Sequence, residues 1–183
     1  AINYALHLKK QAEKVTLCDL DIVNPYFRTS DAESILSANG IDLIASPFAN
    51  TNVDAPALPA RTRAIFDNAD TLAVIDLGGD DRGALALGRY AKMLNAEKHE
   101  MLLVINQFRP LTRSLSDLAE IRAEIEAASN VAFTGIVNNS NLGPHTTLED
   151  IRDTLPFAEE ASAALSLPIK MTAIQDTLLA GAD

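Results

Sequence analysis

The chain has 183 residues, of which 48% are hydrophobic and 22% charged, and its formal net charge is −10 at pH 7. These values are typical of a globular domain and exclude a disordered chain. The negative charge argues against direct nucleic-acid binding and against an anionic membrane surface, but not against phosphate ligands held by glycine loops. The single cysteine, Cys18, suits a reducing cytoplasmic compartment, and no apolar run approaches the roughly 20 residues of a membrane span.

The first ten residues have the pattern of a helix interior. Ile2, Ala5 and Leu6 share one helical face, but neither a methionine nor an N-cap residue precedes them. We therefore expect that a segment upstream of Ala1 is missing from this sequence.

Short apolar runs alternate with helical segments along the rest of the chain. The runs predict strands at 15–21, 41–44, 72–76, 101–106 and 132–138, and an edge strand at 168–172. Helices are predicted at 30–38, 60–68, 83–94 and 115–128, from Pro156 onward, and after a cap at 172–175; capping boxes are predicted at 30–33 and 146–149. The long segment 45–59 is expected to be a functional loop or lid. This alternation predicts an α/β fold, a three-layer, mostly parallel sheet with helices on both faces.

The stretch 72–81 carries the strongest local signal. An apolar strand ends at Asp76, and Gly78 and Gly79 follow directly. A carboxylate at a strand end can hold the water shell of Mg²⁺, and glycine N–H groups can bind a terminal phosphate. The alternative is a strand followed by an ordinary tight turn.

Four predicted strands end on polar side chains. These residues are Asp19 with Asp21, Asp76, Asn106 and Asn138. Because parallel strands place their carboxyl ends along one edge of a sheet, we expect a single crevice to collect all of them.

Residues 19–28, 74–81 and 135–140, in this order, resemble a bacterial ATP-binding family of the CobQ/CobB/MinD/ParA (SIMIBI) class. This class of P-loop NTPase-like proteins is related to the nitrogenase iron protein and to dethiobiotin synthetase. The resemblance covers essentially the whole chain. Members carry a glycine-rich P-loop ending in Gly-Lys-Thr, and this sequence has none. The resemblance therefore implies one nucleotide-binding domain over 1–183, with its N-terminal strand and P-loop absent from the sequence.

The resemblance implies roles for the acidic and glycine residues. Asp21 matches the switch-I carboxylate that positions the attacking water, and Asp19 matches an acid close to the metal. Asp76 is assigned to the water shell of Mg²⁺, and Gly78 and Gly79 match switch II, where a backbone N–H meets the terminal phosphate. The alternative is a solvated turn after each strand.

The resemblance also implies a base-binding region. Asn106 and Asn138 match strand ends that contact the base in relatives, and a carboxamide can both donate to and accept from the edge of adenine. Pro110 and Asn139 would flank the base. The alternative is that each Asn caps the turn that follows it.

The function expected from the resemblance is an ATP-binding protein, a Mg²⁺-dependent ATPase that acts as a nucleotide switch in the cytoplasm. Relatives often dimerise face to face around two nucleotides, so the resemblance implies a homodimer or an unknown protein partner for this chain. One alternative is an ATP-dependent, carboxylate-activating ligase of the dethiobiotin synthetase or CobB type. Another is a non-catalytic interaction module with the same fold.

Overall fold

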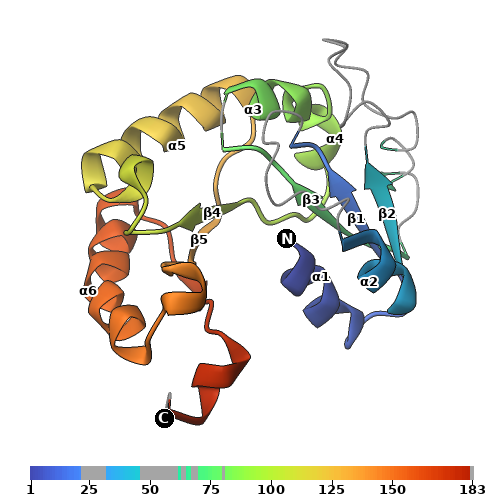
Figure 1. Cartoon of the computed structure of the whole chain (residues 1–183). Coiled ribbons are helices and arrows are strands. Elements are labelled where there is room, and N and C mark those ends of the chain that lie inside the picture. Colours follow the sequence, from blue (N-terminus) through green and yellow to red (C-terminus); the bar gives the residue numbers. More distant parts are fainter. Residues whose placement is uncertain (22–31, 46–61, 63–64, 67–69, 80, 182–183) are drawn as a thin grey trace, which may run out of the picture. The chain divides into compact units, whose positions relative to one another are not determined.

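The computed structural model describes residues 1–21, 32–45, 62, 65–66, 70–79 and 81–181. The chain divides into two compact units, a first unit of Ala1–Glu97 and a second unit of Lys98–Asp183. Figure 1 shows the labelled elements of both units. Within the described residues, no helix combines the length and the apolar character that a membrane crossing needs.

The first unit contains a sheet of three parallel strands in the order β2-β1-β3. The central strand β1 is buried along its whole length, as expected for an apolar strand with neighbours on both sides. The predicted strands at 15–21, 41–44 and 72–76 are confirmed, although the first ends at Asp19. The elements of this unit are α1 (Ile2–Lys9), β1 (Val15–Asp19), α2 (Glu33–Ala38), β2 (Ile41–Ala45), β3 (Leu72–Asp76), α3 (Asp81–Gly88) and α4 (Ala91–Leu94).

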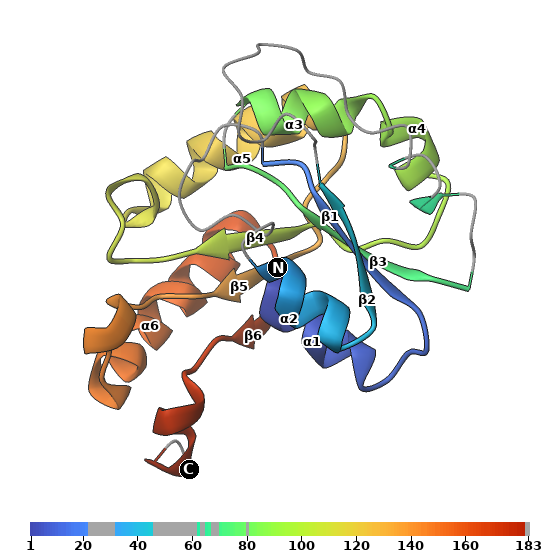
Figure 2. The same ribbon diagram turned by 45° about the vertical axis from the view of Figure 1, so that its right-hand side comes forward.

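Helices α1 and α2 lie together on one face of this sheet (Figures 1 and 2). Ala5 of α1 and Leu36 of α2 are completely buried, as is Leu17 of β1, and all three belong to one hydrophobic cluster. Removing apolar surface from water stabilises such a cluster by roughly 25 cal/mol per Å². The cluster therefore fixes the sheet, and with it the positions of the residues at the strand ends.

The prediction of one helix over 83–94 is wrong, because α3 ends at Gly88 and α4 begins only at Ala91. Tyr90 interrupts the helix. Its backbone N–H donates to the Leu87 carbonyl at 2.8 Å, and its ring stacks on Phe66 with 5.4 Å between ring centroids. Glycine has a low helix propensity, so the chain can turn after Gly88 to make this stacking contact.

The second unit contains another sheet of three parallel strands, in the order β4-β5-β6. Helix α6 packs on β5 and β6, and α5 packs on α6; Figure 2 shows this arrangement of α6 and the sheet. The strand expected at the edge is confirmed as β6, whereas the expected terminal helix is of the 3₁₀ type. The elements are β4 (Leu102–Ile105), η3 (Pro110–Thr112), α5 (Leu115–Ser129), β5 (Gly135–Asn138), η4 (Gly143–His145), α6 (Leu148–Leu165), β6 (Ile169–Thr172) and η5 (Asp176–Gly181).

Helix α6 begins earlier than predicted. Pro156 lies inside it rather than at its start, and the capping box joins Thr147 to Asp150 instead of spanning 146–149. An interior proline costs about 3 kcal/mol or more because a backbone hydrogen bond is lost. One face of the helix buries six side chains, which offsets this cost: Ile151, Thr154, Phe157, Ala158, Ala161 and Leu165.

The strands of the described residues form two separate parallel sheets instead of the single sheet expected. The α/β class and the parallel pairing are confirmed. The outer strands β2 and β6 carry exposed charges, Asp42 and Lys170. The outer strands β3 and β4 carry no exposed charge and expose apolar side chains, Leu72 at 46% and Val104 at 54% of full exposure; β6 also exposes Ile169, at 36%. Charged residues on an outer strand discourage pairing with another chain, so β3 and β4 lack a protection that β2 and β6 have.

Several predictions fall on residues outside the described ranges. These are the residues 22–28 of the family resemblance, Ser30 and Asp31 of the first capping box, the loop at 46–59 and most of the helix at 60–68. In the described part, α2 begins at Glu33 with Ala32 as its N-cap residue.

Candidate functional site

In the first unit, the predicted acidic residues meet at the carboxyl ends of two neighbouring strands. Asp19 ends β1, Asp76 ends β3, and the two residues are partners in the parallel register. The backbone N–H of Leu20 donates to the Asp76 carbonyl oxygen at 2.8 Å, which extends the pairing by one residue. Asp19 is buried at 6% exposure, whereas the Asp76 side chain is half-buried. The two side chains therefore share one end of the sheet, as parallel pairing predicts.

Asp21 is held beside Asp19 by a local turn. The Asp21 backbone N–H donates to the Asp19 Oδ1 at 3.0 Å, a contact that Asp side chains commonly make with the backbone two residues on. Asp19 thereby stabilises the start of the segment after β1. The turn leaves the Asp21 side chain half-buried.

The glycine turn after β3 is packed tightly against the beginning of α3. A Cβ atom added at Gly83 would lie 3.0 Å from the Gly78 nitrogen and 3.1 Å from its carbonyl oxygen. Gly78 is buried, but Gly79 is exposed, and a Cβ added there meets nothing within 4 Å. Gly83 thus allows the turn to approach the helix, whereas Gly79 is exposed.

Sequence reasoning did not assign Gly83 to the site. The signal was a third glycine, five residues after Gly78, at the beginning of a predicted helix. Glycine at such a position indicates a close approach of backbone segments.

Cys18 precedes Asp19 on β1 and is fully buried. The pKa of its thiol is raised to about 11, mainly by burial; the hydrogen bond with the Thr62 hydroxyl lowers the pKa in part, and the nearby Asp19 contributes to raising it. The thiol is therefore protonated near neutral pH and packs as a small apolar group. Cys18 therefore has a structural place in the strand.

Among the described residues, no group of three or more His, Cys, Asp or Glu side chains is arranged to hold a metal ion. Mg²⁺ is commonly held by one or two carboxylates together with waters and substrate phosphates. Asp19 and Asp76 supply two carboxylates at one sheet end, so the residues present fit that kind of site.

In the second unit, Asn106 follows β4 and its side chain is engaged in the turns around it. Its Oδ1 accepts from the Phe108 N–H at 3.0 Å and from the Asn141 N–H at 3.4 Å, and its Nδ2 donates to the Asn141 carbonyl at 3.3 Å. Its backbone carbonyl accepts from the Thr112 hydroxyl at 2.5 Å. Asn106 therefore caps its own turn and also joins it to the loop after β5.

Asn138 ends β5 and is 1% exposed. Its Oδ1 accepts from the backbone N–H of Ser140 at 3.1 Å and from the Ser140 hydroxyl at 2.7 Å, while its Nδ2 donates to the Thr154 hydroxyl on α6 at 3.1 Å. The Ser140 hydroxyl in turn accepts from the Gln107 N–H at 3.0 Å. The turn-capping alternative for both asparagines is thus observed directly.

Sequence reasoning missed the partners Thr112, Ser140, Asn141 and Thr154. The run Asn-Asn-Ser-Asn at 138–141 signalled a turn, but its contacts with 106–107 and with α6 are formed between residues distant in the sequence.

Pro110 and Asn139, the predicted flanking residues, are both exposed. Pro110 begins η3, and the Asn139 carbonyl accepts from the Asn141 Nδ2 at 2.7 Å. The structure thus gathers the predicted residues into two sets. One set lies in the first unit and consists of Asp19, Asp21, Asp76, Gly78 and Gly79. The other set lies in the second unit and consists of Asn106, Pro110, Asn138 and Asn139. The single crevice for all of them stays a prediction.

Comparison with protein-family models, with curated proteins and with solved structures found no match to this chain.

Proposed function

We propose that the chain is part of an ATP-binding, Mg²⁺-dependent nucleotide switch. The observation that carries the proposal is the pairing of Asp19 with Asp76 at the ends of adjacent parallel strands, with a glycine turn directly after the second strand. In open α/β sheets, ligands bind outside the carboxyl ends of the strands. The carboxylates and glycines therefore stand where a nucleotide site is expected.

The predicted site residues of the first unit have distinct parts in the proposed chemistry. Asp76 holds the water shell of Mg²⁺, with Asp19 close to the metal. Asp21 orients the water that attacks the terminal phosphate, and the exposed turn at Gly79 offers its backbone N–H to that phosphate. In such reactions, positioning and neutralisation of charge supply most of the rate, so no covalent intermediate with the protein is required.

The outer strands β3 and β4 support the same proposal. The N–H and C=O groups of successive residues in a parallel strand point to alternate sides. Because Leu72 and Asp76 bond to β1, the backbone groups of Ala73 and Ile75 point away from it. By the same alternation, Leu102 and Val104 point away from β5, since Met101 and Ile105 bond to it.

A P-loop strand of the resembled class lies in the middle of its sheet and needs a pairing edge on either side. The outer edge of β3 in the first unit, and that of β4 in the second, are each of the kind with which such a strand pairs. The proposal therefore assigns binding of the terminal phosphate to the glycine turn.

The test is titration of the full-length protein with a non-hydrolysable ATP analogue and Mg²⁺, followed by calorimetry. We expect binding that Asp76→Asn weakens on the order of tenfold or more, because loss of a partner in the metal's outer shell has effects of that size. Asp42→Asn, on the far outer strand β2, is the matched control and should bind as the unchanged protein does. Failure of the unchanged full-length protein to bind would refute the proposal.

The ligase alternative depended on the loop at 45–59, nearly all of which lies outside the described residues. Hydrolysis that requires a small carboxylic acid would favour that alternative over the switch. A homodimer around two nucleotides also stays a prediction, which the mass of the nucleotide-bound protein in solution tests.

A further inference from the structure

Two loops of the second unit are tied to each other. One runs from β4 to α5, over 106–114, and the other runs from β5 to α6, over 139–147. We call them the paired loops, because the Asn106 side chain exchanges two hydrogen bonds with the backbone of Asn141. Residues that are distant in the sequence thus lie next to one another at one end of this unit.

Each of the paired loops is also ordered internally. The Thr112 hydroxyl donates to the Asn106 carbonyl at 2.5 Å. The Thr146 hydroxyl accepts from the Leu142 N–H at 2.9 Å and donates to the Gly143 carbonyl at 2.7 Å. A surface whose backbone is already held loses less conformational entropy when a partner binds.

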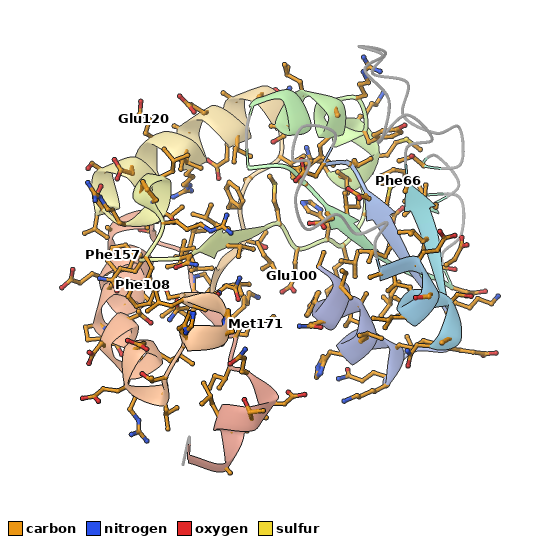
Figure 3. The ribbon with its side chains drawn as sticks, viewed as in Figure 1. Phe66, Glu100, Phe108, Glu120, Phe157 and Met171 are labelled. Carbon is orange, nitrogen blue, oxygen red and sulfur yellow. The ribbon has the colours of Figure 1, made fainter. Side chains whose placement is uncertain are left out.

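The paired loops expose three large apolar side chains. Phe108, Leu111 and Leu142 are 40%, 73% and 45% exposed, and Leu111 is the most exposed large hydrophobic residue of the described part of the chain. Figure 3 labels Phe108 and also Phe157 of α6, which is buried. Single apolar side chains are common on protein surfaces, but several on adjoining, ordered loops indicate an interaction surface.

The charge of the paired loops is opposite to that of the whole chain. The chain has 25 acidic residues and 15 Lys or Arg residues, yet neither loop contains an Asp or a Glu. Arg109 and Arg113 lie on the first loop, and both are exposed. Neither guanidinium makes an ion pair or a hydrogen bond with a described residue. The first loop therefore combines two available cations with exposed apolar side chains.

We propose that the paired loops dock an acidic peptide segment of another protein. Its carboxylates pair with Arg109 and Arg113, and its apolar side chains pack on Leu111 and the neighbouring apolar residues. A guanidinium binds a carboxylate through two parallel N–H···O bonds, and arginine and aromatic residues are enriched where proteins bind one another. This docking is independent of nucleotide binding.

The composition of the loops favours a polypeptide over other anionic partners. Nucleic acids and anionic lipid surfaces are bound through many basic groups, and the net charge of −10 opposes both. Nucleobases stack on aromatic rings, whereas the loops contain one Phe and no Tyr or Trp. Two arginines beside aliphatic side chains match a few carboxylates beside apolar residues.

The first step of the test selects ligands for the full-length protein, without nucleotide, from a phage-displayed library of random peptides. We expect the enriched peptides to combine Asp or Glu with large apolar side chains. The most enriched peptide is synthesised with a fluorescent label, and its Kd is measured by fluorescence anisotropy. No enrichment, or enrichment of peptides without acidic residues, would overturn the proposal.

The second step measures this Kd for charge variants. The double variant Arg109→Glu/Arg113→Glu should weaken binding on the order of tenfold or more, because like charges then face each other. The double variant Lys92→Glu/Lys98→Glu changes the net charge equally, at exposed positions outside the loops, and should bind as the unchanged protein does. Equal affinities of the two double variants would refute the docking surface.

The third step tests the apolar contact and the competing partners. Leu111→Ala should weaken peptide binding by about fivefold or more, whereas Leu155→Ala, on α6 and 39% exposed, should not change it. Equal affinities of these two variants would contradict the apolar contact. Vesicles of anionic phospholipid and a DNA duplex are measured in parallel, together with sedimentation of the protein alone. Tighter binding of vesicles or DNA than of the peptide, or self-association that Arg109→Glu/Arg113→Glu abolishes, would overturn the proposal.

Discussion

The ends of β3 and β5 follow the same pattern in the sequence, an apolar strand that stops on a polar side chain, yet the two ends differ in the structure. Asp76 is half-buried at the end of its strand, beside Asp19 in the register. Asn138 is buried, and its carboxamide bonds to Ser140 and Thr154. A polar residue at a strand end is therefore equally compatible with a ligand site and with a structural turn. Which of the two it forms depends on the partners that the fold brings within reach.

The sharpest test of this contrast compares the stabilities of two alanine variants. Asn138→Ala should lower the free energy of unfolding by about 2–3 kcal/mol, because it leaves buried partners at Ser140 and Thr154 unsatisfied. Asn139→Ala, at the exposed neighbouring position, should lower it by about 0.5 kcal/mol or less. Urea denaturation of each variant measures both values. Equal effects of the two substitutions would contradict a structural role for Asn138.

The edges of the two sheets offer a second test, with an effect of about 2 kcal/mol. If a further strand pairs with β4 in the full-length protein, Val104→Lys buries a charge there and should destabilise the protein by at least that amount. Asp42→Lys on the charged outer strand β2 serves as the control and should cost about 0.5 kcal/mol or less. Thermal unfolding of full-length protein reports both. If Val104→Lys left the stability of the full-length protein unchanged, this edge would be exposed in that protein.

The glycine turn of the first unit should be sensitive at one position and tolerant at another. Gly83→Ala places a Cβ 3.0 Å from the Gly78 backbone, and we expect a loss of about 1 kcal/mol after the gain in helix propensity is counted. Gly79→Ala meets open space and should change stability by about 0.5 kcal/mol or less. Chemical denaturation distinguishes them, and a stabilised Gly83→Ala would argue against the close approach.

The smallest expected effect concerns the capping box at the beginning of α6. The Thr147 hydroxyl and backbone N–H both donate to the Asp150 carboxylate and lower the pKa of this carboxyl below its ordinary value. A lowered pKa in the folded state means that the contribution is present above the unfolded pKa and is lost as the pH falls through the folded one. Stability measured from pH 5 downward should therefore decline less in Asp150→Asn than in the unchanged protein. Identical pH profiles would contradict this.

Much of the fold could be predicted from the sequence because it depends on local signals. The apolar runs placed all six strands found in the described part of the chain, and their alternation with helices established the parallel α/β class. The errors came where tertiary contacts overrode a local rule. Pro156 was expected to begin a helix, but burial along α6 carries the helix through it. Tyr90 was expected inside a helix, but its stacking on Phe66 breaks it.

The candidate site divides in the same way. The residue types at the strand ends, and the choice of Asp19, Asp76, Asn106 and Asn138 as residues of interest, came from the sequence alone. Only the tertiary structure decided that the two aspartates are partners in register and that the two asparagines are engaged by Ser140, Asn141 and Thr154. The physical reason is that strand pairing and hydrogen bonding depend on distance in space, whereas partners such as Asp19 and Asp76 are separated by 57 residues along the chain.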